Sequence, residues 1–334
     1  MNNTKQRRIN LYASRSIGET LSATFDFVTQ NFVPLIKFLS AFLLPVSALM
    51  GLSYQSMFSS FAHIDNLNDE TEQILSVVMS YLPVLVLCLI GALLTVAVTY
   101  TLMQKYQQRD NLLKGLTLSE IKPLLKHNLW RVFKMLLLLT LIGIVAFVVL
   151  VLVATMIMAI GGKFEAFLFL LYMAMLAIAL PLGLVLPMCV FEPELGLFSC
   201  VKKALRLGFK TWGTLFVVML VITMLVQIVS FILMIPFLFT TMTTMFFEID
   251  STQYASLAYT SSAWFSVLTF ASSLLFCFGL LLMSALSFVA FAFCYGRAAD
   301  KVEGVSVKNA VQNFDSTSST EDTTADIISQ FDKE

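Results

Sequence analysis

Two clusters of basic residues stand directly before long apolar runs and are the groups best placed to bind a ligand. The first consists of Lys122, Lys126, Arg131 and Lys134, and the second of Lys202, Lys203, Arg206 and Lys210. Ammonium and guanidinium groups beside an apolar helix face suit the phosphates of anionic lipids, and each contributes about 1 kcal/mol near an anionic surface. Trp130 and Trp212 have the side chain that favours the membrane–water boundary. These ten residues are predicted to form a lipid-headgroup interface.

The only acidic pair beside a predicted span on the cytoplasmic side is Glu192 and Glu194. General acid–base catalysis needs titratable groups that converge near a substrate. The predicted spans contain His, Asp, Glu, Lys and Arg only at their ends. We interpret the pair as charges at the start of a helix whose first position is Pro193. The sequence therefore predicts no catalytic residue and a protein that is not an enzyme.

A metal site is not expected either. The chain has two histidines, His63 and His127, and its five cysteines show no metal-ligand spacing. Because no cysteine falls in a predicted external loop, we expect no disulfides. No cofactor is predicted.

Composition places the chain in a membrane. Apolar residues make up 58% and charged residues 13%, against about 45–50% and about 25% in soluble domains. Six charge-free runs are each longer than the roughly 20 residues that a spanning helix needs. The predicted spans are Pro34–Gly51, Ile74–Thr101, Met135–Ile160, Ala166–Val190, Leu215–Thr240 and Phe265–Tyr295. The polar stretch Ser251–Trp264 is read as an external loop.

These spans predict an all-α polytopic protein with three regions. Residues 1–33 form a cytoplasmic N-terminus with an amphipathic helix. Residues 34–296 form the transmembrane domain, with cytoplasmic loops at 104–134 and 191–211. Residues 297–334 are cytoplasmic and end in a polar, acidic tail that is predicted to be disordered.

The distribution of basic residues predicts the orientation. Of the 21 Lys and Arg residues, all but Lys163 fall on one side of the six spans, while the opposite loops are acidic. By the positive-inside rule, both termini are then cytoplasmic. We expect a multi-pass protein of the bacterial inner membrane.

Three amphipathic helices are predicted, each before a pair of spans. Apolar residues recur with helical spacing from Ile17 to Phe32, from Leu118 to Val132 and from Val201 to Phe209. Ser16 to Glu19 and Thr117 to Glu120 fit the capping box, although Pro123 then lies inside the second helix. We expect the joints to begin at three residues: Asn31, Asn128 and Lys210.

Gln227 is the most prominent polar residue within the spans. We interpret it as an interhelical hydrogen-bonding residue more readily than as a substrate ligand. An ion-coupled carrier would place charged groups at this depth, and the spans have none there. Prolines in four of the spans, two of them in the fourth, leave a lateral groove for an amphiphile conceivable.

The stretch LPLGLVLPMCVFEPELGLFSCVKKALRLGFKTWGTLF (180–216) resembles the membrane domain of certain glycerophosphodiester phosphodiesterases and related stand-alone proteins. SIGETLSATFDFVTQNFVPLIK (16–37) resembles the start of such stand-alone proteins in Bacteroidota-like bacteria. The resemblance implies that Glu192 is the family's acidic residue at the end of an apolar helix. Ala204 departs from the pattern, and without a soluble phosphodiesterase domain the resemblance implies no hydrolase activity.

The sequence thus favours a non-enzymatic membrane protein that serves envelope or lipid organisation through its interfacial basic helices. The alternative is a carrier or flippase-like protein for an amphiphilic solute. The expected partners are membrane lipids with anionic headgroups and no nucleic acid. A homo-oligomer and other protein partners stay open.

Overall fold

A computed structural model of the chain describes residues 9–62, 70–109, 113, 115–159, 164–249, 262–308 and 311. Helices are the only regular secondary structure in these ranges. They are α1 (Ile17–Gln30), α2 (Phe32–Ala62), α3 (Glu70–Gln108), α4 (Leu118–Ala159), α5 (Phe164–Gly183), α6 (Val185–Phe191), α7 (Leu197–Lys210), α8 (Trp212–Ile249) and α10 (Ala263–Glu303). The predicted acidic tail falls almost entirely outside the described residues.

Six of the helical stretches are long and apolar enough to cross a membrane. They coincide with the six predicted spans and confirm an all-α, multi-pass membrane protein. Most extend beyond the predicted bounds, because apolar periodicity does not mark where a helix continues into polar residues. The fourth span is divided near Leu184, where α5 ends and α6 begins.

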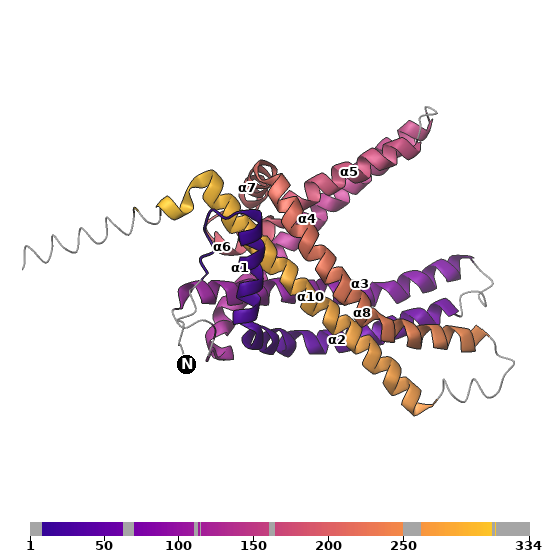
Figure 1. Cartoon of the computed structure of the whole chain (residues 1–334). Coiled ribbons are helices and arrows are strands. Elements are labelled where there is room, and N and C mark those ends of the chain that lie inside the picture. The colour runs from indigo at the N-terminus through magenta and orange to yellow at the C-terminus, as the bar shows by residue number, and fades with distance from the viewer. Residues whose placement is uncertain are drawn as a thin grey trace, which may run out of the picture.

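Helix α10 occupies the centre of the molecule (Figure 1) and packs against α1, α2, α3, α6, α7 and α8. It contributes to two apolar cores. One contains Phe27 of α1, Tyr100 of α3 and Phe293 of α10. The other contains Leu207 of α7 and Tyr295 of α10. The polar end of α10 therefore links the first and the second half of the chain.

Two of the three predicted joints are present. Asn31 separates α1 from α2 with φ −116° and ψ 22°, and Thr211 separates α7 from α8 with φ −119° and ψ 18°. Each side chain also donates a hydrogen bond to the carbonyl four residues earlier, Asn31 to Phe27 O at 3.0 Å and Thr211 to Leu207 O at 2.9 Å. These shared features make α1–α2 and α7–α8 geometrically equivalent units.

The middle joint is absent, which corrects the prediction. Helix α4 runs without a break from Leu118 through Asn128 into the membrane-spanning part. The Asn128 amide donates instead to Thr101 Oγ1 at 3.0 Å and Gln104 Oε1 at 2.7 Å on α3. Because these bonds fix Asn128 to a neighbouring helix, it does not end its own.

The capping box at Ser16 and Glu19 forms with both reciprocal bonds, as predicted. At the start of α4, the Thr117 hydroxyl donates instead to the Glu120 carboxylate at 2.8 Å. Pro123 lies inside α4, which tolerates it near its N-terminal end.

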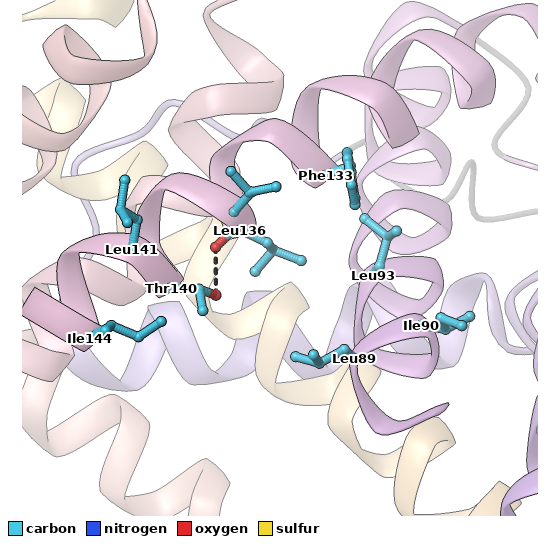
Figure 2. Close-up of a pocket in the computed structure, with 9 residues that line it drawn as sticks. Leu89, Ile90, Leu93, Phe133, Leu136, Thr140, Leu141 and Ile144 are labelled. Carbon is cyan, nitrogen blue, oxygen red and sulfur yellow. Dashed lines mark hydrogen bonds between the residues drawn. The ribbon is translucent and has the colours of Figure 1, made fainter. Parts of the chain in front are cut away.

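A groove opens between the membrane-spanning parts of α3 and α4. The α4–α5 pair extends away from α2 and α3 (Figure 1), and the most apolar stretch of α4 has none of its residues buried. Figure 2 shows the groove, with Leu89, Ile90 and Leu93 of α3 facing side chains of α4. Its volume is about 370 Å³.

Candidate functional site

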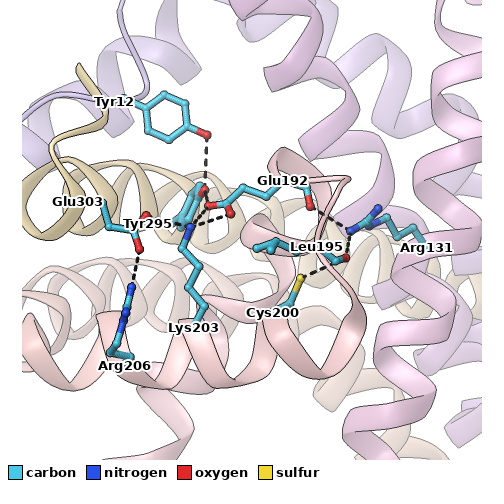
Figure 3. Close-up of polar contacts among 9 residues, drawn as sticks. All are labelled: Tyr12, Arg131, Glu192, Leu195, Cys200, Lys203, Arg206, Tyr295 and Glu303. Carbon is cyan, nitrogen blue, oxygen red and sulfur yellow. Dashed lines mark hydrogen bonds and ion pairs between the residues drawn. The ribbon is translucent and has the colours of Figure 1, made fainter. Parts of the chain in front are cut away.

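The end of α6, the middle of α7 and the polar end of α10 bring a set of ionic side chains together (Figure 3). The Lys203 ammonium donates to both carboxylate oxygens of Glu192, at 2.8 and 2.7 Å. It also pairs with Glu303 Oε2 at 2.9 Å. Glu192 stands just after α6, Lys203 is on α7 and Glu303 ends α10. One ammonium therefore connects three helices.

The same set extends on both sides of this pair. Arg206 donates to Glu303 Oε1 at 2.7 Å. Tyr295 donates its hydroxyl to Glu192 Oε1 at 2.5 Å, and its oxygen lies 3.5 Å from the Tyr12 hydroxyl of the N-terminal segment. We call these six residues the polar clamp: Tyr12, Glu192, Lys203, Arg206, Tyr295 and Glu303.

The polar clamp has little capacity left for a ligand. Its two carboxylates and two cations balance in charge, and all four carboxylate oxygens already accept a hydrogen bond or an ion pair. Burial alone would lower the pKa of Lys203, but the bonds and charges of Glu192 and Glu303 outweigh it and raise that pKa. A charge-balanced cluster of this kind fixes helix positions, and only Arg206, whose side chain is 58% exposed, keeps donors for a headgroup phosphate.

Arg131 binds backbone carbonyl groups. Its guanidinium donates to Glu192 O at 3.0 Å, Leu195 O at 2.7 Å and Pro193 O. These carbonyls follow the C-terminal end of α6, where a positive charge is favourable. The spacing of the basic residues could have distinguished Arg131 from the lysines. Lys122 and Lys126 lie on one face of α4, whereas Arg131 lies on another face.

The predicted helix start at Pro193 is wrong. Helix α7 begins at Leu197 with Gly196 as its N-cap, and residues 193–196 form turns. Glu192 is the C-cap of α6, so it cannot be a first-turn charge of α7. Glu194 is exposed in the turn. Gly196 in the extended conformation supplies the helix start that the proline was expected to give.

Helices α1 and α7 bury a face next to their predicted apolar stripes, and only Leu21, Val28 and Val201 of those stripes pack partly against the core. The buried residues of α1 are Thr20, Ala23, Thr24 and Phe27, and those of α7 are Cys200, Ala204, Leu207 and Gly208. On the outer surface, Phe25 and Phe32 of the first stripe are 36% and 55% exposed. Phe198 and Phe209 on α7 are 73% and 53% exposed. We call these two outer faces the outer stripes. The outer stripe of α1 contains the exposed residues Ile17, Phe25 and Phe32, and that of α7 contains Phe198 and Phe209.

The stripe at the start of α4 faces the opposite way. Ile121, Leu125 and Val132 are buried in the apolar core. Leu118, the first residue of this stripe, is 51% exposed. The protein itself therefore covers this face of α4.

The predicted headgroup residues divide into bound and unbound cations. Arg131, Lys203 and Arg206 are bound within the protein as described above. Five lysines are exposed and have no carboxylate partner within the described ranges: Lys122, Lys126, Lys134, Lys202 and Lys210. Lys134 Nζ lies 5.1 Å from the ring centre of Trp130, which is itself 59% exposed.

Trp212 and Gln227 differ from the expectations. Trp212 is half-buried, and its indole N–H donates to Ala177 O at 3.0 Å, which ties α8 to α5. Gln227 is exposed on α8 and has no hydrogen-bond partner among the described residues. It lines a largely apolar groove of about 560 Å³ with Phe231, Met234 and Phe276. The interhelical bond predicted for Gln227 is therefore absent from the described structure.

Within the described ranges, no three His, Cys, Asp or Glu side chains are placed to hold a metal ion. Comparison with family models, curated proteins and solved structures gave no match. The resemblance of 180–216 to a phosphodiesterase-associated membrane domain thus stays a prediction. Sequence reasoning missed Tyr12, Tyr295 and Glu303, because hydrogen bonds between residues as far apart as Glu192 and Tyr295 leave no local pattern.

Proposed function

We propose that this protein organises lipid at the cytoplasmic face of a bacterial inner membrane and does so without catalysis. The observation that supports this most is the pair of outer stripes on α1 and α7. Each stripe carries exposed apolar side chains, Ile17, Phe25 and Phe32 in one and Phe198 and Phe209 in the other. Each lies on a helix that joins a spanning helix through a single residue. The headgroup–acyl boundary is the environment that suits such a helix.

The energetics of these stripes favour lipid over water. Full burial of a Phe side chain contributes about 1.5–3 kcal/mol, and four Phe residues lie on the outer stripes. Lys202 and Lys210 flank the α7 stripe with no partner in the described structure, so they are available to headgroup phosphates. The polar clamp then holds α7 against α10 while the outer face of α7 contacts lipid.

The orientation belongs to the same proposal. By the positive-inside rule, the basic residues beside α1, α4 and α7 support a cytoplasmic location of these helix ends and of both termini. A reporter active only in the cytoplasm, fused after Glu334, is expected to be active, and the same reporter fused after Asp69 is expected to be silent. An inactive fusion after Glu334, with the protein inserted, would contradict the orientation.

The carrier alternative receives less support. Gln227 faces outward, and several hydroxyls deep in the spans bond to their own helices, such as Ser47 to Leu43 O at 2.8 Å and Thr95 to Gly91 O at 2.8 Å. Groups bonded in this way are not presented to a polar solute. The buried hydroxyls of Thr99 and Tyr100 have no partner among the described residues, but they lie in the apolar core and not in a groove.

Lipid retention tests the proposal. The Lys202→Gln/Lys210→Gln variant removes the two unpaired cations of α7, and we expect it to purify with less anionic lipid at unchanged stability. Lys163→Gln, on the opposite side of the predicted topology, is the matched control and is expected to retain the full amount. Full retention by the double variant would show that these lysines only set the orientation, and the proposal would fail.

A further inference from the structure

The groove between α3 and α4 continues into a stripe of cations. On α4, Phe133, Leu137, Thr140 and Ile144 line the groove. The same stripe extends toward the polar end through Trp130, Lys126 and Lys122, in steps of three and four residues that keep one helix face. All seven of these side chains are exposed.

The groove itself presents only hydrocarbon. Its one hydroxyl belongs to Thr140, and that group donates to Leu136 O at 2.8 Å (Figure 2). The threonine methyl and the neighbouring leucines are what an occupant would contact. Such a lining suits an acyl chain and offers nothing to a polar solute.

The dimensions fit one leaflet. Phe133 and Ile144 are about 16 Å apart along the helix axis at 1.5 Å per residue, and half of a hydrocarbon core is about 15 Å. The volume of about 370 Å³ lies at the lower end of the range for ligand pockets. A helix of the same length and about 10 Å in diameter occupies more than roughly 1,000 Å³, so the groove is too narrow to enclose a partner helix.

The charges indicate which lipid. Trp130 is about 4.5 Å above Phe133 along the axis, and Lys126 is about 10 Å above it. These heights fall in or next to the headgroup layer, which is about 5–8 Å deep on each side. Lys134 lies over the Trp130 ring, and none of Lys122, Lys126 and Lys134 has a carboxylate partner among the described residues.

We propose that the α3–α4 groove binds one acyl chain of an anionic phospholipid, whose phosphate is held by Lys126 and Lys134 beside Trp130. The inference rests on the lipid-organising function proposed above and gives it a defined binding site. The site is separate from the α7 stripe, so either can fail alone.

Trp130 gives a local readout. The chain has three tryptophans, so Trp212→Phe with Trp264→Phe leaves Trp130 as the only indole. The full-length protein in detergent is titrated with phosphatidylglycerol, or with phosphatidylcholine, brominated on the acyl chain. We expect phosphatidylglycerol to quench Trp130 with a midpoint about 10- to 30-fold lower than phosphatidylcholine.

Two variants on this background sharpen the test. Lys126→Gln/Lys134→Gln should raise the phosphatidylglycerol midpoint about fivefold per lysine and leave the phosphatidylcholine midpoint unchanged. Thr140→Phe, which places a ring in the groove at an exposed position, should weaken quenching by both lipids several-fold.

The control is Lys202→Gln/Lys210→Gln on α7, which should leave both midpoints unchanged while it tests the proposed function through lipid retention. Equal midpoints for the two lipids in the parent, or no effect of the α4 lysines, would mean that the groove takes bulk lipid only. A change in oligomeric mass with Thr140→Phe, at unchanged quenching, would assign the groove to a second copy. Either result overturns the site.

Discussion

Helix α7 and the first turns of α4 share a pattern of apolar and basic residues but pack differently. Each combines an apolar stripe with four Lys and Arg residues. In α4 the stripe of Ile121, Leu125 and Val132 is buried. In α7 the stripe is less covered, because Val201 and Leu205 are half-buried and Phe209 is 53% exposed. The buried residues of α7 lie on another face: Cys200, Ala204, Leu207 and Gly208. An apolar stripe thus shows that a face avoids water, but not whether protein or lipid covers it.

The backbone explains the difference. The break at Thr211 frees α7 from the axis of α8. Because Gly208 has no side chain, α7 can approach α5 closely: a methyl group at Gly208 would lie 2.7 Å from Pro181 Cα. Helix α4 has no break and must continue along its own axis, so its stripe packs against α3 and its neighbours.

The largest expected effect is on the free energy of unfolding when one residue of each stripe is replaced by alanine. Ile121→Ala creates a cavity in the core and should lower the free energy of unfolding by about 2–4 kcal/mol. Phe209→Ala should change it by less than about 0.5 kcal/mol in detergent, because this ring is exposed. Unfolding by denaturant in a mild detergent measures both, and equal losses would contradict this difference in packing.

A smaller effect is expected at the close approach of α5 and α7. Gly208→Ala gains about 1 kcal/mol in helix propensity but forces a backbone shift at Pro181, which costs about 1–3 kcal/mol. The matched control is Gly213→Ala on α8, where an added methyl group meets nothing within 4 Å. We expect a lower melting temperature for the first and an equal or higher one for the second. A stabilised Gly208→Ala would show that α7 does not pack as described.

The lysines of α7 and α4 are also expected to differ in their contribution to stability. Lys203→Gln removes an ammonium that joins Glu192 and Glu303, and should cost about 1–2 kcal/mol for a pair that is still partly exposed. Lys126→Gln should be within about 0.5 kcal/mol of the parent.

The pH dependence follows from the raised pKa of Lys203. A group with a raised pKa in the folded state stabilises fully below its unfolded value and loses this contribution as pH rises through the folded value. The difference between parent and Lys203→Gln should therefore persist at neutral pH and decline only above pH 10.5, the ordinary lysine value. Thermal unfolding at several pH values measures it, and a difference that vanishes near pH 8 would argue against the polar clamp.

Much of the architecture was predictable from the sequence, and the contacts were not. Runs without charge predicted all six spans, since lipid excludes ionised groups wherever they occur in a span. The capping box at Ser16 was predictable because its partners are three residues apart. The pairing of Glu192 with Lys203 and Tyr295 depends on how three helices pack, and the continuity of α4 depends on the bonds of Asn128 to α3.

The smallest expected effect concerns the capping box of α1, which has no counterpart of the same geometry at α4. Ser16→Ala should cost about 1 kcal/mol, whereas Thr117→Ala should cost less. The hydrogen bond from the Ser16 backbone N–H lowers the pKa of Glu19. The contribution of the Glu19 carboxylate, which Ser16→Ala leaves in place, is therefore present above pH 4.5 and declines as pH falls through the lower, folded value. Hydrogen exchange of the first turn of α1 measures the loss, and equal effects at both sites would contradict the difference.

The central claim is that the outer stripe of α7 contacts lipid at the headgroup–acyl boundary. The most direct test is Phe209→Trp in a chain whose native tryptophans are replaced by Phe, reconstituted into vesicles. We predict strong quenching by lipids brominated near the headgroup end of the chain, weaker quenching by lipids brominated near the methyl end, and little quenching by aqueous iodide. Strong iodide quenching without quenching by either brominated lipid would place this face in water and contradict the account.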